Sequence, residues 1–162
     1  MTATMNPDTG AEVATRALCT FWLGGLLFGI DVLRTQEVLR AQRITDVPTA
    51  PPVVVGLMNL RGQIVPCCEL RELLSLGRRS DDREALHVVV RNGDEPLSLL
   101  VDEIGDVVDV RPDRFEAAPS TVSPVVRDLL VGAHKLDDRL LLELNTDRML
   151  AGLRSGGDNG GS

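Results

Sequence analysis

The chain has 162 residues, of which 43% are hydrophobic and 2% are aromatic, and its net charge is −7 at pH 7. The length suits one domain, or two small subdomains that share a core, and the hydrophobic fraction excludes a disordered chain. Because an acidic chain repels phosphate backbones and so few rings offer no stacking surface for bases, we expect no nucleic-acid partner.

The lack of a recognisable targeting signal and the odd number of cysteines predict a cytoplasmic protein. No apolar stretch approaches the roughly 20 residues that span a bilayer, so we expect no membrane insertion. The N-terminus lacks the basic region and apolar run of a signal peptide. Three cysteines, an odd number, argue against a disulfide framework, and Cys67 and Cys68 have no second pair at metal-ligand spacing. We expect buried, reduced thiols.

Short strands joined by tight turns are predicted for the first part of the chain. Residues 1–15 have no hydrophobic period and are expected to form a flexible arm. Gly24-Gly25 is a strong hairpin signal between strands at 18–23 and 26–30. The pattern over 32–39 indicates a helical turn that leads into a strand.

Proline and glycine interrupt the middle of the chain. The prolines of segment 47–52 make it stiff and extended, and 53–57 is a strand or a short helix. A strand resumes at 64–65, with Pro66 near its end. Three leucines at i, i+3 and i+4 spacing predict a helix over 69–76.

A charged, solvated loop is expected at 78–84, and the second half again predicts short strands joined by tight turns. Asn92-Gly93 is the strongest short-range hairpin signal in the sequence. The chain is irregular over 115–126, a short helix is expected at 146–150, and 154–162 is expected to be a flexible tail. The predicted strands cover 86–90, 97–101, 104–110, 130–136 and 140–144.

About ten short, closely spaced strands with two short helices predict an all-β fold. Such spacing with frequent turn signals is typical of a barrel or a sandwich. A single sheet of that many strands would curl or split, so two small barrels are expected.

Residues that could carry catalysis do not converge. His87 and His134 fall in separate predicted strands with no evident partner, so each is expected to be a satisfied or solvated side chain. No nucleophile-elbow, phosphate-loop or zinc-protease motif occurs. An acidic run would be split between two faces by strand alternation, which favours a solvated edge over a cation site. This run contains Asp102, Glu103, Asp106 and Asp109. We expect no catalytic residues, no cofactor and no metal.

One stretch, GLMNLRGQIVP at 56–66, allows two interpretations. Asn59 and Gly62 both tolerate positive φ, so the stretch could be only a tight turn. Arg61 would sit at the tip of that turn, where its planar fork suits a carboxylate or a row of carbonyls on a partner.

The chain resembles the CheW family of chemotaxis adaptors from about residue 18 to 153. The resemblance rests on five sequence motifs that occur in the same order as in the family. They are FGIDVL at 28–33 running into QEV at 36–38, Val47-Pro48 with a following proline pair, GLMNLRGQIVP at 56–66 continued by ELR at 69–71, LLVDEI at 99–104 with Val107, and LLLELN at 140–145.

The resemblance implies two intertwined five-stranded, SH3-like barrels within 16–153, as subdomains of roughly 16–78 and 79–153 with strand exchange. It implies no catalysis and two partners, the regulatory domain of the CheA histidine kinase and the cytoplasmic tip of a methyl-accepting chemoreceptor, in arrays at the inner membrane face. Leu60 and Gly62 would shape the motif turn. The implied receptor-binding residues are Thr35, Glu37, Val38, Asn59 and Arg61. Subunits could also self-associate in rings.

Three other interpretations stay open. A CheW-like scaffold could serve a chemosensory pathway for twitching, gliding or surface sensing, which the sequence does not separate from flagellar swimming. A small barrel that binds a ligand is a different class. An enzyme of unknown type is disfavoured by the lack of a converging acid–base set.

Overall fold

A computed structural model describes residues 16–40, 42–48, 53–77 and 86–159, with side chains as far as Leu153. The arm expected at 1–15, the charged loop expected at 78–84 and prolines 51 and 52 lie outside the described residues. Of the tail expected at 154–162, the structure describes only backbone, which belongs to a helix as far as residue 159.

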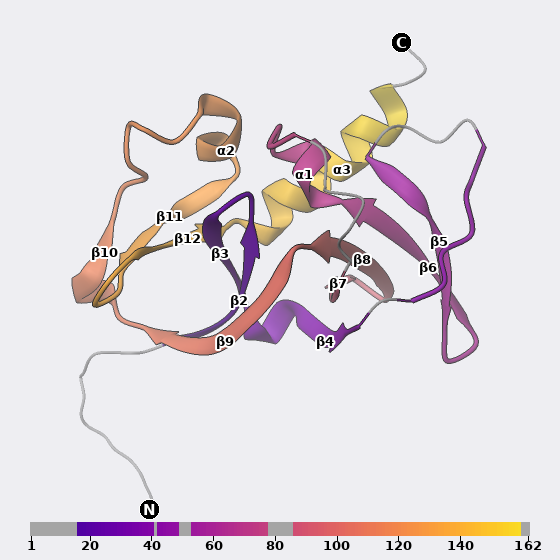
Figure 1. The fold of residues 1–162 in the computed structure, drawn as a ribbon, viewed down its shortest axis with the longest axis horizontal. Helices are drawn as coiled ribbons and strands as arrows, with labels where there is room; N and C mark the ends of the chain where they lie inside the picture. The colour runs from indigo at the N-terminus through magenta and orange to yellow at the C-terminus, as the bar shows by residue number, and fades with distance from the viewer. Residues whose placement is uncertain (1–15, 41, 49–52, 78–85, 160–162) are drawn as a thin grey trace, which may run out of the picture.

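Two β-sheets make up most of the described chain (Figure 1). The first sheet contains, in spatial order, β10 (Phe115–Glu116), β11 (Leu130–Lys135), β12 (Leu140–Leu144), β3 (Leu26–Asp31), β2 (Arg16–Leu23) and β9 (Glu103–Val110). The second contains β4 (Thr35–Leu39), β7 (Leu86–Asn92), β8 (Glu95–Val101), β6 (Gln63–Glu69) and β5 (Val54–Leu60). The predicted all-β fold with two strand assemblies is confirmed. The first sheet has six strands rather than five because the short β10 forms within the stretch expected to be irregular.

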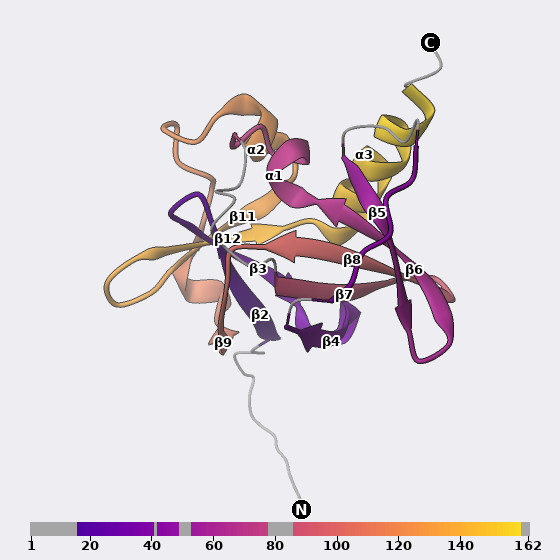
Figure 2. The same cartoon turned by 45° about the vertical axis from the view of Figure 1, so that its right-hand side comes forward.

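The chain crosses between the sheets twice. The first crossover leads from β3 to β4 through the 3-10 turn η1 (Val32–Arg34), and the second leads from β8 to β9 through Asp102. The first two and the last four strands of the described chain therefore build the first sheet, and the strands between them build the second (Figures 1 and 2). The subdomain division at 78/79 remains a prediction, whereas the sheets themselves separate at these two crossovers.

Each sheet contains one parallel pair of strands that joins distant parts of the sequence. In the first sheet β12 lies parallel to β3, with Leu142 opposite Phe28. In the second sheet β6 lies parallel to β8, with Cys67 opposite Ser98. The remaining pairs are antiparallel. Long-range pairs of this kind cannot be read from local hairpin signals.

The hairpin predicted at Gly24-Gly25 is confirmed. Both glycines have positive φ, 56° and 82°, and Leu23 pairs with Leu26 on either side of them. Two consecutive left-handed residues are typical of a type I′ turn, whose twist matches that of the flanking strands. The turn after Asn92 is confirmed as well, with Asn92 opposite Glu95.

The helices differ from expectation in length and number. Helix α1 (Leu70–Leu73) has one turn, because Leu74 leaves the helical region and Ser75 adopts a φ of 55°. Helix α2 (Pro124–Asp128) was not predicted, although proline is favoured at the first helical position and Ser123 caps the turn. Helix α3 (Thr146–Asn159) begins where expected and continues beyond residue 150. None of the helices in the described residues is both long and apolar enough to cross a membrane.

Pro66 lies inside β6 rather than at the end of a strand. It pairs with Leu57 of β5 on one side, whereas β8 joins the other side of β6 only from Cys67 onward. The missing N–H of Pro66 therefore costs the parallel ladder no hydrogen bond.

One hydrophobic core joins the two sheets. Its largest cluster takes Phe21 and Phe28 from the first sheet, Val88 and Leu99 from the second and Met149 from α3. Fully burying each such side chain stabilises the fold by about 1.5–3 kcal/mol. Neither sheet closes this core alone, so the sheets are held in a defined relative position.

Candidate partner-binding site

The turn between β5 and β6 presents Arg61 to solvent. Arg61 and Gly62 have φ values of 54° and 87°, and the side-chain oxygen of Asn59 accepts a hydrogen bond from the backbone N–H of Gly62 at 2.8 Å. Leu60 pairs with Gln63 and closes the turn. The expected tight turn is present, and it leaves 69% of the Arg61 side chain exposed.

Glu37 of β4 receives the guanidinium of Arg61. Nη1 of Arg61 donates to Oε2 of Glu37, and this hydrogen bond lowers the pKa of the Glu37 carboxyl. The two residues are 24 positions apart in sequence, so the pair fastens the hairpin turn to β4. Because Arg61 remains largely exposed, its other donors can still meet a partner.

A backbone bridge also joins the chain after β4 to the far edge of the second sheet. Thr45 and Leu57 exchange N–H···O bonds of 2.7 and 2.8 Å, and Leu57 lies in β5. The spatial order of that sheet places β4 and β5 at opposite edges. The segment around Thr45 therefore curls the sheet towards a barrel and brings β4 near the β5–β6 hairpin.

The five expected contact residues do not form a single cluster. Glu37, Asn59 and Arg61 meet at the hairpin turn. Val38 follows Glu37 directly and points to the other face of β4, where its side chain is 41% exposed. Thr35 is half-buried at the start of the strand, where its hydroxyl donates to the backbone oxygen of Asp31 at 3.3 Å.

A groove between the two sheets begins at Val38. It has a volume of about 500 Å³ and combines aliphatic side chains with one residue of each charge sign. Its lining residues are Val38, Leu39, Arg40, Leu86, Glu103 and Ile104. They come from β4 and the residue that follows it, from β7 of the second sheet and from β9 of the first, so only the tertiary structure brings them together.

The two histidines have partners that the sequence did not reveal. Nδ1 of His87 lies 2.7 Å from the hydroxyl of Ser98, and Nε2 of His134 lies 2.7 Å from Oε1 of Glu143. All four residues are buried. Among the described residues no three His, Cys, Asp or Glu side chains gather closely enough to hold a metal ion.

The acidic run divides into two kinds of residue. Glu103, Asp106 and Asp109 are exposed, as expected for a solvated edge. Asp102 departs from that expectation, because its side chain is 9% exposed and forms an ion pair with Arg71 of α1. The buried, unbridged cysteines expected at 67 and 68 are confirmed.

Comparison with known proteins places this geometry in a family. Residues 17–154 match the family model described as a CheW-like domain. The chain belongs to the CheW-like family. The two-sheet architecture and the in-order motifs of the sequence agree with this assignment.

Named relatives cover most of the chain. It is 28% identical to "Chemotaxis protein CheW" of Klebsiella aerogenes over 149 residues, which are 92% of this chain and 89% of the relative. It is also 28% identical to the CheW of Bacillus subtilis, over 86% of this chain and 90% of that one. The crystal structure of the scaffolding protein TtCheW from Thermoanaerobacter tengcongensis superposes with a TM-score of 0.71 at 25% identity, covering 82% of this chain and 90% of that one.

Proposed function

We propose that this chain is a non-catalytic chemotaxis adaptor that couples the cytoplasmic tips of chemoreceptors to the CheA histidine kinase in signalling arrays. The observation that carries the proposal is the CheW-like domain, which spans residues 17–154 and so accounts for nearly all of the described fold. The named relatives are chemotaxis proteins, and the similar solved structure is a scaffolding protein. Such an adaptor works in the cytoplasm, at the inner face of the membrane.

The proposed receptor-facing surface has two parts. Glu37, Asn59 and Arg61 supply the charged and polar part, shaped by the turn at Leu60 and Gly62. The second part lies on β4, where Val38 lines the groove and Thr35 stands at the start of the strand. A receptor tip is a helical bundle, and an amphipathic helix suits an apolar groove with a few charges at its margin.

The mechanism of an adaptor is geometric. It holds the regulatory domain of CheA and a receptor in a fixed relation, and repeated modest contacts in an array produce avidity without one tight interface. Self-association of the barrels in rings would add further contacts of the same kind. The family assignment supports a scaffolding role without catalysis.

The first experiment is a titration of the purified protein with the regulatory domain of CheA from the same organism. Micromolar or tighter binding is the expected result. Absence of binding to every CheA of that genome would remove the adaptor function and leave the fold assignment standing.

A second experiment tests the receptor-facing surface. Arg61→Glu removes the exposed guanidinium and puts a second carboxylate opposite Glu37, so we expect weaker binding to a receptor-tip fragment. Thermal unfolding should stay unchanged because Arg61 is exposed. Arg114→Glu, at an exposed ion pair with Asp137 next to the first sheet, is the matched control. Equal receptor affinity of the Arg61 variant and the wild type would reject this surface.

A further inference from the structure

Asp31 lies where the chain leaves the first sheet for the second, and it makes contacts in three directions. Its Oδ1 accepts a hydrogen bond from the backbone N–H of Leu33 at 2.9 Å, which caps η1. Its backbone oxygen accepts from the hydroxyl of Thr35 at 3.3 Å. Its Oδ2 lies 3.5 Å from Nη1 of Arg16. Two of these contacts hold the turn that aims β4, and the third ties that turn to the first sheet.

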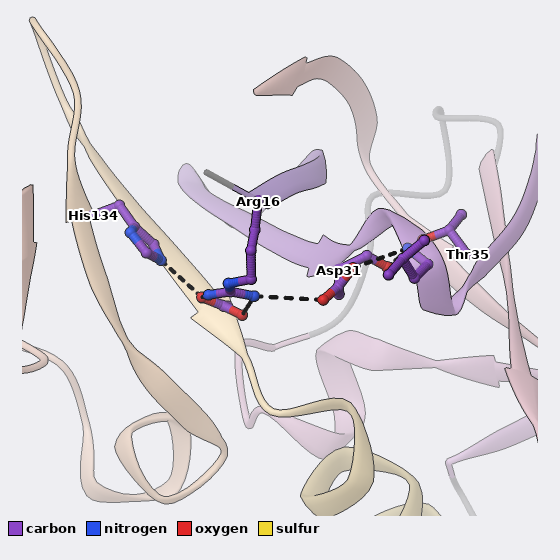
Figure 3. Close-up of polar contacts among 6 residues, drawn as sticks. Arg16, Asp31, Thr35 and His134 are labelled. Atoms are coloured by element: carbon purple, nitrogen blue, oxygen red, sulfur yellow. Dashed lines mark hydrogen bonds and ion pairs between the residues drawn. The ribbon is translucent and has the colours of Figure 1, made fainter. Parts of the chain in front are cut away.

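Arg16 is held in turn by a buried carboxylate on β12. Its Nη2 and Nη1 donate to Oε1 and Oε2 of Glu143 at 2.7 and 2.9 Å. The side chains of Glu143 and His134 are 5% and 4% exposed and lie 2.7 Å apart. Bidentate pairs of this kind impose a defined geometry on both partners. Figure 3 shows the resulting row of contacts, from His134 through Arg16 to Asp31 and Thr35.

The start of β4 has weaker restraints elsewhere. The strand lies at an edge of the second sheet, and its register with β7 shifts between Thr35 and Glu37. Arg34 of η1 forms an ion pair with Asp147 at 3.0 Å, but that carboxylate is 83% exposed, and such pairs contribute little. The ladder with β7 holds β4 from Glu37 onward, and the contacts of Asp31 position the start of the strand before the register shift.

We propose that Asp31 and Arg16 are positioning residues for the partner-binding surface, because they aim β4 so that Glu37 meets Arg61 and Val38 borders the groove. This inference rests on the proposed function and extends it to residues outside the surface itself. The buried carboxylate of Glu143 holds the guanidinium of Arg16 in place beside Asp31.

A pair of substitutions at position 31 separates the contacts. Asp31→Ala removes the cap and the charge, whereas Asp31→Asn keeps an oxygen that can cap Leu33 and removes only the charge. For a receptor-tip fragment we expect about tenfold weaker binding with Asp31→Ala and about threefold weaker binding with Asp31→Asn, because the second variant keeps the cap and loses only the charge that pairs with Arg16. Binding to the CheA regulatory domain should stay unchanged in both variants.

A direct readout of position accompanies the affinities. In amide NMR spectra, Asp31→Ala should shift the resonance of Arg61, which is 30 positions away in sequence and contacts β4 through Glu37. Asp31→Asn should restore most of that resonance position. An unshifted Arg61 amide in Asp31→Ala, or equal losses of receptor and kinase binding, would overturn the proposal.

Two further measurements keep the test decisive. If wild-type protein fails to bind the receptor fragment, the proposed function fails, while the Arg61 amide still reports whether Asp31 positions β4. If Asp31→Ala does not fold, Thr35→Val removes only the hydroxyl contact to Asp31. A shifted Arg61 amide in Thr35→Val supports the proposal, and an unshifted one contradicts it.

Discussion

Arg71 of α1 donates two hydrogen bonds to the carboxylate of Asp102, from Nε to Oδ1 at 3.0 Å and from Nη2 to Oδ2. The same carboxylate accepts from the N–H of Gly24 at 3.0 Å, and the N–H of Asp102 donates to the carbonyl of Trp22 at 3.0 Å. Asp102 thus joins the second crossover, α1 and the β2–β3 hairpin. The first crossover carries Asp31 beside Arg16, and the second carries Asp102 beside Arg71. Each crossover between the sheets therefore has an aspartate next to an arginine.

Removing the arginine at the second crossover should destabilise the fold. The side chains of Arg71 and Asp102 are 14% and 9% exposed, so Arg71→Ala would leave a carboxylate with little access to water. We expect a loss of about 2–4 kcal/mol in the free energy of unfolding, measured by urea denaturation. Arg114→Ala, which breaks an exposed pair with Asp137, should change it little. Equal losses in the two variants would show that Arg71 contributes no more than a surface charge.

Acid should weaken the anchor at Glu143. Burial raises the pKa of Glu143, but hydrogen bonds from Arg16 and His134 outweigh burial, and the pKa lies below its ordinary value of 4.5. Because the folded state favours the ionised carboxylate, this contribution to stability is complete above about pH 4.5 and is lost as pH falls through the lower folded-state pKa.

The corresponding variant is Glu143→Gln. We expect it to lower the free energy of unfolding by about 2 kcal/mol at pH 7, and the difference from wild type should shrink below pH 4.5. Denaturant titrations at several pH values measure this change. Glu116→Gln, at an exposed carboxylate 3.9 Å from Lys135, should show no such trend. A difference for Glu143→Gln that stays constant from pH 7 to pH 3 would contradict the assignment.

The adjacent cysteines should be unreactive in the folded protein. Burial raises the pKa of Cys67 to about 11 and that of Cys68 to about 12, so almost no thiolate exists at pH 8. A colorimetric thiol reagent should therefore modify at most Cys19 before unfolding and all three cysteines in guanidinium. Cys19→Ser is the control and should show no fast reaction. Rapid modification of Cys67 or Cys68 in native protein would rule out the buried environment.

A methyl group at Gly56 should disturb the bridge beside the hairpin. A Cβ there would overlap the carbonyl oxygen of Thr45 and lie 2.7 Å from Cγ2 of Ile44. Gly56→Ala should cost about 2 kcal/mol of stability and speed the hydrogen exchange of the Leu57 amide, which donates to Thr45. Gly152→Ala in α3 is the matched control, because its nearest neighbour is a flexible leucine end at 3.2 Å. Unchanged exchange at Leu57 would argue against the overlap.

Local signals predicted the strands better than the helices. The hairpin at Gly24-Gly25 and the helical turn before β4 follow from residues that lie next to each other, and both are confirmed. Helix α1 is shorter than its leucine spacing suggests, because Leu74 leaves the helical region and Ser75 adopts a positive φ. Proline in a strand predicts a strand end, and this prediction is wrong for Pro66 because the sequence does not show that one edge of β6 lacks a neighbour at that point.

The sequence alone determined the all-β class, the turn that exposes Arg61 and the family resemblance, since each depends on residues that are neighbours along the chain. The tertiary structure decided that Arg61 meets Glu37, that Asp102 is held by Arg71 and that a groove opens beside Val38. These contacts join positions that are far apart along the chain. Which side chains meet depends on where the chain crosses between the sheets and on how strands from both ends of the chain pair. Short-range sequence patterns predict neither.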